Sequence, residues 1–145
     1  MLRYAQFLTE VLDQKAALAK LTALADEEYS VWSPNVIPCE AIFHWDADNP
    51  PAQNWNDTVT YRKKVGGVKL QNIPVNKLIP TQDGVTVSGI TRFIKQNPNR
   101  WNEGDEIVRI VAKAGRFYVM DGHHRCAAAI LMGYTTVPAE LQPLY

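Results

Sequence analysis

Two adjacent histidines and an arginine follow an Asp-Gly pair in the stretch VMDGHHRCAAAILMGY, residues 119–134. The apolar run before this pair predicts a strand, and the alanine, isoleucine and leucine run after it predicts a helix. The first turn of a helix leaves about four backbone N–H groups without partners and carries about half a positive charge. Because three further donor side chains stand there, we expect an anion at residues 121–125, and phosphate fits best.

Each residue type in this stretch suits that chemistry. Gly122 allows a tight turn and a close approach of the backbone to a ligand. Arg125 can present a planar fork of donors to a phosphate or carboxylate. His123 and His124 can donate hydrogen bonds, and a nearby anion favours their protonation.

Three alternatives stay open for these side chains. Asp121 can cap the helix and neutralise Arg125, which would leave no site. Asp121, His123 and His124 can form a metal site, although adjacent histidines on a helix point about 100° apart and rarely share a metal. Cys126 can be a reactive thiol near the helix start, but among alanines we favour a buried packing residue.

The elements around this stretch predict an α+β fold. Residues 106–122 read as a hairpin of two β-rich runs joined near residues 113–115, and Gly133 is placed to end the helix that follows. Residues 86–96 predict a short helix, capped by Thr86 or Ser88. Residues 58–75 predict another hairpin with Gly66-Gly67 at its turn, and the last residues predict a short strand.

The chain divides into two predicted parts. Residues 1–57 comprise a long helix from residue 2 to about 28 and an extension rich in Trp and Pro, in which we take His44 as a structural histidine. Residues 58–145 form the predicted domain. The helix offers a surface for docking, for a protein partner or for a homo-oligomer.

A neutral total charge conceals an asymmetry between these parts. Residues 1–57 carry three basic and nine acidic side chains, whereas residues 58–125 carry twelve basic and five acidic ones. Either the two parts face each other or the second part meets an anion. Arg62, Lys63, Lys64 and Lys69 lie on the predicted hairpin and are candidates for contact with nucleic acid, or for a solvated edge strand.

Composition bounds the setting of the protein. The chain of 145 residues has a hydrophobic fraction of 46% and two cysteines. These values indicate a globular protein without a disulfide scaffold. No apolar run reaches the length of a membrane helix and no secretion signal is evident, so we expect no membrane association and a cytoplasmic location. For a viral chain, that location is the host cytoplasm or the virion.

Two motifs together resemble the ParB/sulfiredoxin-like superfamily, which includes ParB-like nucleases. The first is IPVNKLIPTQDGVTVSGITRFI at residues 73–94, and the second is DGHHRCAAAILMGY at residues 121–134. Their order and spacing agree with that superfamily over residues 67 to about 140. The resemblance implies a small mixed sheet with helices, preceded here by the long N-terminal helix. It also implies that the turn at residues 121–125 holds nucleotide phosphates, in a phage or bacterial protein.

The members that this chain resembles differ in chemistry, and this sequence departs from several. Sulfiredoxins carry a reactive cysteine at the position of His123, and Cys126 does not match it. A free-serine kinase of the superfamily uses a glutamate near the first motif, where only Asp83 can stand in. Partition proteins continue into further DNA-binding and dimerisation regions, so we expect this chain not to be a full partition protein.

The resemblance and the residues together predict a nucleotide-binding domain for ATP or CTP with Mg²⁺, with phosphotransfer or nucleotide hydrolysis as its activities. Gly122, His123, His124 and Arg125 would hold the phosphates, with Thr81 and Gln82 beside them. Catalytic candidates are Asp121, Asp83 and His123, and Asp121 is also the candidate metal ligand.

Two other functions are kept beside this one. The basic hairpin favours a DNA-binding or nuclease module, with Trp101 or Tyr61 stacking on bases. The lack of a clear catalytic glutamate favours a catalytically inactive viral or structural interaction protein.

Overall fold

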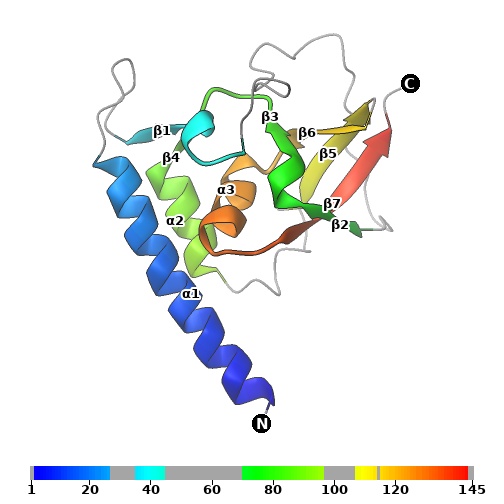
Figure 1. Cartoon of the computed structure of the whole chain (residues 1–145). Coiled ribbons are helices and arrows are strands. Elements are labelled where there is room, and N and C mark those ends of the chain that lie inside the picture. Colours follow the sequence, from blue (N-terminus) through cyan, green and yellow to red (C-terminus); the bar gives the residue numbers. More distant parts are fainter. Residues whose placement is uncertain (1, 27–34, 45–69, 97–106, 114, 144–145) are drawn as a thin grey trace.

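The computed structural model describes residues 2–26, 35–44, 70–96, 107–113 and 115–143. Its described part is mixed α and β, as predicted, with three α-helices and a curled mixed sheet. In Figure 1 the helices lie on one side of the molecule and the sheet on the other, with α3 between α2 and the strands. The assignment to the ParB/sulfiredoxin-like superfamily remains a prediction.

The helices follow the predicted patterns closely. α1 spans Leu2–Ala25, α2 spans Val87–Lys95 and α3 spans His123–Leu131. α1 ends before the acidic run that starts at Asp26, where the helix macrodipole disfavours negative charge. Thr86 caps α2 through its side chain, which accepts a hydrogen bond from the backbone N–H of Gly89.

The sheet has five strands in the order β2-β7-β5-β6-β3. The strands are β2 (Leu70–Pro74), β3 (Leu78–Pro80), β5 (Val108–Lys113), β6 (Arg116–Asp121) and β7 (Thr136–Pro143). β5 pairs parallel with β7 and antiparallel with β6, and β3 pairs parallel with β6. The carboxyl ends of β3 and β6 therefore lie at the same edge of the sheet, so the segments that follow these strands begin close together.

Two predicted hairpins have different outcomes. β5 and β6 form the hairpin expected at residues 106–122, with Lys113 opposite Arg116. The second arm of the other hairpin is β2, which pairs with β7. Its first arm and its turn at Gly66-Gly67 lie outside the described residues.

A second, two-stranded sheet joins the amino-terminal part of the chain to the rest. β1 (Val36–Pro38) pairs antiparallel with β4 (Gly84–Thr86), and the 3-10 turn Cys39–Ala41 follows β1. Another 3-10 turn, Val75–Lys77, leads into β3. β4 thus runs between the end of β3 and the start of α2, and β1 flanks it.

One hydrophobic core joins both predicted parts of the chain. α3 is its centre, because seven of its nine residues are buried. Ala17 and Leu21 of α1 and Ile37 of β1 pack in the same cluster as Ile90 and Ile94 of α2. These burials place one face of α2 inward, as the spacing of its apolar residues predicts.

α1 docks on the body through its carboxyl-terminal half, where it contacts α2 and α3. Figure 1 shows its amino-terminal part extending beyond α2. Within the described ranges, no helix combines the length and apolar character needed to cross a bilayer.

Candidate functional site

The parallel pair β3–β6 brings the two sequence motifs together. Pro80 at the end of β3 lies opposite Val119 on β6. Beyond these positions, the loop at residues 81–83 and the turn at residues 121–125 leave the same edge of the sheet. A direct hydrogen bond between Thr81 and His123 places Thr81 beside the turn.

His123 is buried and points back to the end of β3. Its Nε2 atom accepts a hydrogen bond from the backbone N–H of Thr81 at 3.0 Å. The Thr81 hydroxyl donates to the carbonyl oxygen of Val119 at 2.6 Å, which fixes the same loop to β6. The Phe43 ring and the imidazole pack in a T-shaped arrangement, with the two ring centroids 6.3 Å apart. His123 thus anchors the loop after β3 to the start of α3.

His124 makes the equivalent connection to the start of α2. Its Nε2 atom accepts from the backbone N–H of Thr86 at 3.0 Å and lies 3.2 Å from the Thr86 hydroxyl oxygen. The ring occupies the space that a side chain on Gly89 would need, because Nε2 lies 2.8 Å from the ideal Cβ position there. Glycine is therefore required at this point of α2 for the imidazole to reach Thr86.

These bonds correct one expectation about the two histidines. Both rings were expected to donate to an anion as cations, but Nε2 of each ring accepts a backbone N–H and must be unprotonated. Burial, with a smaller contribution from the neighbouring His124, lowers the pKa of His123 from 6.5 to about 4. Burial also lowers the pKa of His124. At neutral pH both imidazoles are uncharged and hold the protein's own backbone.

Arg125 is also directed into the protein. Its side chain is completely buried, and Cζ lies 4.9 Å from the centroid of the Phe93 ring on α2. A guanidinium over an aromatic face is a favourable cation–π arrangement. In this structure Arg125 therefore supports the packing of α3 on α2 and does not present its fork at the surface.

The backbone of the turn keeps the features of an anion site. Gly122 is the N-cap of α3 with a φ of 97°, and no side chain caps the helix. The first intrahelical bond is from the N–H of Cys126 to the carbonyl of Gly122. The N–H groups of His123 and His124 have no acceptor among the described residues. These donors sit at the positive end of the helix macrodipole.

Asp121 does not cap the helix or pair with Arg125, so the alternative that it neutralises Arg125 is wrong. Its carboxylate lies 3.4 Å from the guanidinium of Arg109 and is 49% exposed. Arg109 is buried on β5, and its Nε lies 3.3 Å from the buried carboxylate of Glu140 on β7. One buried cation therefore stands between an interior carboxylate and a carboxylate at the surface beside Gly122.

Sequence reasoning missed Arg109 and Glu140. Arg109 stands between valine and isoleucine in a β-rich run, and Glu140 stands between alanine and leucine in another. The sequence does carry one signal for this pair: each charged residue is flanked by apolar residues in its run, and the two charges have opposite signs. Buried charges are usually paired, so such residues are candidates for an ion pair inside the sheet. Only the strand order β7-β5-β6 shows that Arg109 lies between Glu140 and Asp121 and contacts both.

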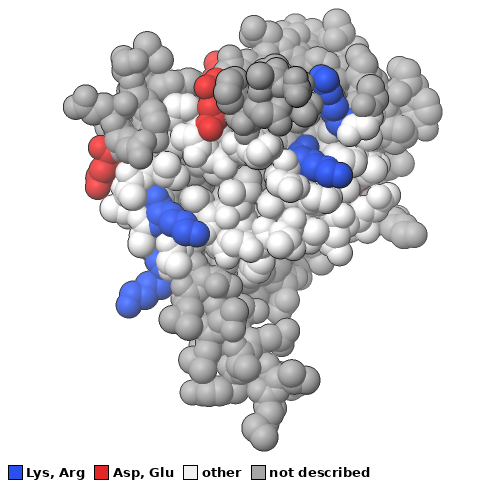
Figure 2. Space-filling view, in the orientation of Figure 1, with Lys and Arg blue, Asp and Glu red and all other residues white. Residues whose placement is uncertain are grey.

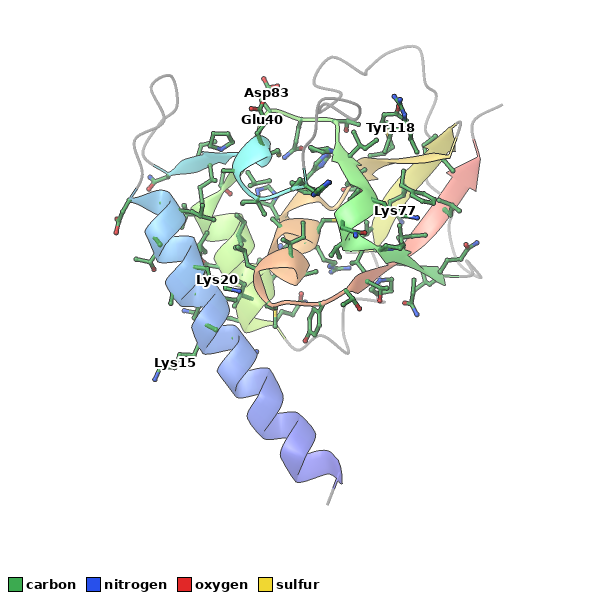
Figure 3. The ribbon with its side chains drawn as sticks, viewed as in Figure 1. Lys15, Lys20, Glu40, Lys77, Asp83 and Tyr118 are labelled. Carbon is green, nitrogen blue, oxygen red and sulfur yellow. The ribbon has the colours of Figure 1, made fainter. Side chains whose placement is uncertain are left out.

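Gln82 and Asp83, the other two predicted site residues of the first motif, have local roles. The Gln82 side-chain amide donates to the carbonyl of Gly84 at 2.8 Å and so shapes its own loop. Asp83 is exposed and lies near Glu40, as Figure 3 shows, and its carbonyl accepts from the N–H of Cys39. Nothing in the described residues joins the Asp83 carboxylate to the 121–125 turn.

Both cysteines are buried free thiols. Burial, together with the Asp83 and Glu40 carboxylates, raises the pKa of Cys39 to about 12. Burial also raises the pKa of Cys126 to about 12, although Arg125 acts in the opposite direction. A reactive thiol needs a lowered pKa and access, so the packing interpretation of Cys126 is the one that the structure supports.

The predicted nucleic-acid residues Arg62, Lys63, Lys64 and Lys69 lie outside the described residues. On the face shown in Figure 2, the Lys and Arg side chains that are described stand apart from one another and form no continuous patch. In the described ranges, no group of three or more His, Cys, Asp and Glu side chains is arranged to hold a metal ion. The trio of Asp121, His123 and His124 is thus not a metal cluster.

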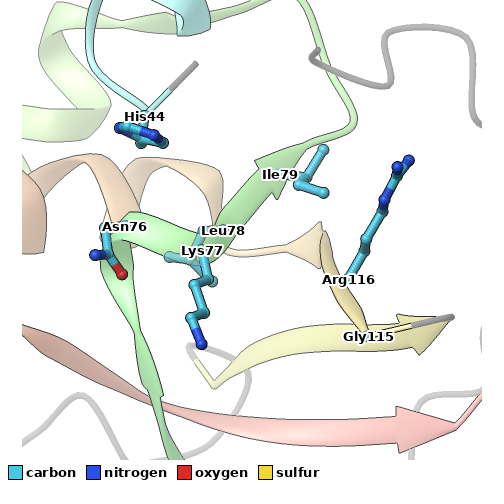
Figure 4. Close-up of a pocket in the computed structure, with 7 residues that line it drawn as sticks. All are labelled: His44, Asn76, Lys77, Leu78, Ile79, Gly115 and Arg116. Atoms are coloured by element: carbon cyan, nitrogen blue, oxygen red, sulfur yellow. The ribbon is translucent and has the colours of Figure 1, made fainter. Parts of the chain in front are cut away.

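A pocket of about 260 Å³ lies at the opposite, amino end of β3 and β6 (Figure 4). It is lined by His44, Asn76, Lys77, Leu78, Ile79, Gly115 and Arg116. It shares no residue with the 121–125 turn. His44, expected to be structural, is exposed and borders this pocket.

Comparison with protein-family models, with curated proteins and with solved structures finds no match to this chain. The candidate site therefore rests on its own geometry at one edge of the sheet. It has two backbone donors with no acceptor among the described residues, a left-handed glycine and a half-exposed carboxylate.

Proposed function

We propose that the 121–125 turn binds the phosphates of a nucleoside triphosphate, ATP or CTP, through the backbone at the start of α3. The observation that carries this proposal is the pair of N–H groups on His123 and His124, which have no acceptor in the described part of the chain. Backbone donors at a helix N-terminus are a common anion site. Gly122 supplies the left-handed φ of 97° that the turn needs, and its missing side chain lets the turn lie against Val108 of β5.

The side chains of the turn then serve the site indirectly. His123 and His124 hold Thr81 and Thr86, so the loop after β3 and the start of α2 are fixed beside the turn. Arg125 packs under it against Phe93. A rigid surround of this kind lowers the free-energy cost of ordering the site when phosphate binds.

Magnesium fits this proposal through Asp121. Mg²⁺ is usually bound by one or two carboxylates together with substrate phosphates and water. The Asp121 carboxylate is half-exposed, and no described residue bonds its Oδ1 atom. Asp121 would be the protein ligand, and the ion would neutralise phosphate charge.

Phosphotransfer and nucleotide hydrolysis stay predictions for this site. Asp121 is the catalytic candidate that borders the turn. His123 is committed to Thr81 through Nε2, and Asp83 lies near Glu40. The proposal is therefore binding of the nucleotide, with Asp121 as the candidate group for any proton transfer.

An NMR titration tests where the phosphate binds. ATP, CTP and pyrophosphate, each with Mg²⁺, are added to ¹⁵N-labelled protein. We expect the amide resonances of His123 and His124 to shift first, because a phosphate oxygen accepts from these N–H groups. Gly133, at the other end of α3 with a φ of 81°, is the internal control and should not move.

A thermal-shift screen with the same ligands and with duplex DNA completes the test. A ligand that binds only the folded chain raises Tm, and the increase grows with the logarithm of ligand concentration relative to Kd. Silence of every nucleotide together with a Tm increase from duplex DNA would replace this proposal by the DNA-binding function. Amide shifts confined to residues far from the turn would also contradict it.

A further inference from the structure

Three charged residues form a row across adjacent strands beside the turn. Arg109 on β5 is the register partner of Glu140 on β7 and also of Asp121 on β6. The guanidinium lies 3.3 Å from Glu140 and 3.4 Å from Asp121. Three neighbouring strands therefore present negative, positive and negative side chains in sequence, ending at the residue before Gly122.

Burial differs sharply along this row. Arg109 and Glu140 are 2% and 3% exposed, whereas Asp121 is 49% exposed. A buried guanidinium requires a counter-charge, and Glu140 provides one inside the sheet. The contact with Asp121 is additional to that pairing, and it links the interior of the sheet to the surface beside the turn.

The direction of the guanidinium is fixed by a third contact. Its NH1 atom donates to the carbonyl of Ile107 at 3.2 Å and to Oδ2 of Asp121 at 3.4 Å. With Oδ2 held by Arg109, the second oxygen Oδ1 is the atom without a partner among the described residues. The carboxylate is thus oriented by one oxygen and available through the other.

We propose that Arg109 is a positioning residue, held by Glu140, that orients Asp121 to bind the Mg²⁺ of a magnesium–nucleotide complex. This inference rests on the proposed function and adds the ligand's form: the metal complex is favoured over the free nucleotide. The row has two carboxylates and one guanidinium, so its net charge repels bare phosphate and attracts a divalent cation. The backbone donors bind phosphate with or without the ion, but the gain from Mg²⁺ depends on this row.

The test measures Kd for ATP and CTP in EDTA and in Mg²⁺, and takes the ratio as the magnesium gain. Asp121→Asn removes the ligand itself. The pair Arg109→Gln with Glu140→Gln removes the positioning residues without leaving a lone buried charge. Loss of a group that orients a metal ligand lowers metal affinity by about 10- to 100-fold. We expect both variants to lower the magnesium gain by about 10-fold or more. Asp121→Asn should also tighten binding in EDTA, because it removes a negative charge beside the phosphates.

The triple variant separates positioning from general damage. If Arg109 acts through Asp121, adding its loss to Asp121→Asn lowers the magnesium gain no further. Arg109→Lys keeps the charge but cannot reach three partners with one ammonium, so it should lose part of the gain. It also serves as the second variant if the paired glutamines prevent folding.

Several results would overturn this inference. A folded Arg109 variant with the full magnesium gain, or an additive triple variant, removes the positioning role. Equal binding by the wild type in EDTA and Mg²⁺ rejects the inference and leaves the proposed function intact. Wild-type protein that binds neither nucleotide in either buffer rejects the proposed function itself.

Discussion

Thr81 and His123, 42 residues apart in the chain, are joined by a hydrogen bond of 3.0 Å from the backbone N–H of Thr81 to the imidazole Nε2. This bond links the loop after β3 to the start of α3, beside the carboxyl ends of the parallel strands β3 and β6. His124 repeats the device toward Thr86. The adjacent histidines that suggested an anion site thus hold the backbone around it, because one accepts the N–H of Thr81 after β3 and the other accepts the N–H of Thr86 at the end of β4.

Replacing His123 by leucine should lower the free energy of unfolding by about 1–3 kcal/mol, because it leaves the Thr81 N–H without its acceptor. Glutamine offers an uncharged carbonyl oxygen near the position of Nε2, so His123→Gln should retain most of the stability. Urea unfolding of the three proteins measures the difference. Equal stability of the leucine and glutamine variants would contradict the role assigned to this bond.

Acid should weaken the fold through the same residue. The pKa of His123 is about 4 in the folded chain and 6.5 for an unburied imidazole. The unfolded chain therefore takes up the proton first as pH falls, and stability declines from about pH 6.5 to about pH 4, where it levels off. The loss attributable to His123 is about 3 kcal/mol.

His123→Gln is the control for that pH dependence, because its amide does not titrate in this range. Unfolding of both proteins between pH 7 and about pH 4 gives a difference curve that cancels the other titrating groups. Relative to the variant, the wild type should lose about 3 kcal/mol of stability across this window. A difference curve that is flat would show that His123 titrates equally in the folded and unfolded chains.

Gly89→Ala should destabilise the protein although alanine favours helices more than glycine. The new Cβ would collide with the His124 ring, so the ring must move away from Thr86. Overpacking of this kind costs about 1–3 kcal/mol. Thermal or urea unfolding gives the change in stability.

A double-mutant cycle with His124→Ala assigns the cause. When the ring is absent, Gly89→Ala should be neutral or stabilising, because only the helix propensity remains. If Gly89→Ala lowers stability equally with and without the imidazole, the collision is not with His124.

Cys39 and Cys126 should be unreactive toward a thiol reagent such as dithionitrobenzoate at pH 8. Both thiols are buried, and the pKa of each is about 12, so the thiolate is scarce in the native chain. Both should react at once after denaturation. Fast labelling of either thiol in the native protein would contradict their packing role.

Sequence patterns predict the elements that depend on local chemistry. The Asp-Gly turn, the alanine-rich run and Gly133 place α3 correctly, because capping and helix propensity act within a few residues. The pairing of β2 with β7 was not predicted, since it joins strands whose partners are set by the overall topology. The hairpin expected at Gly66-Gly67 was an inference from local turn signals alone.

The directions of the side chains in the candidate site could not be predicted from the sequence either. Spacing shows that His123, His124 and Arg125 share the first turn of a helix, and it does not show which atoms they meet. That depends on β3 and α2 arriving beside α3, which brings Thr81, Thr86 and Phe93 to these side chains. Arg109 and Glu140 were missed for the same reason, because their partnership exists only once β5 and β7 are neighbours.

The place of β7 between β2 and β5 has a consequence for synthesis. β7 follows the other four strands of this sheet in chain order, yet it lies in the interior of the sheet. Until they emerge, two strands expose open edges to water and to other nascent chains. The five-stranded sheet can therefore form only after residues 136–143 have been made, and a chain stalled before residue 136 is a natural substrate for chaperones.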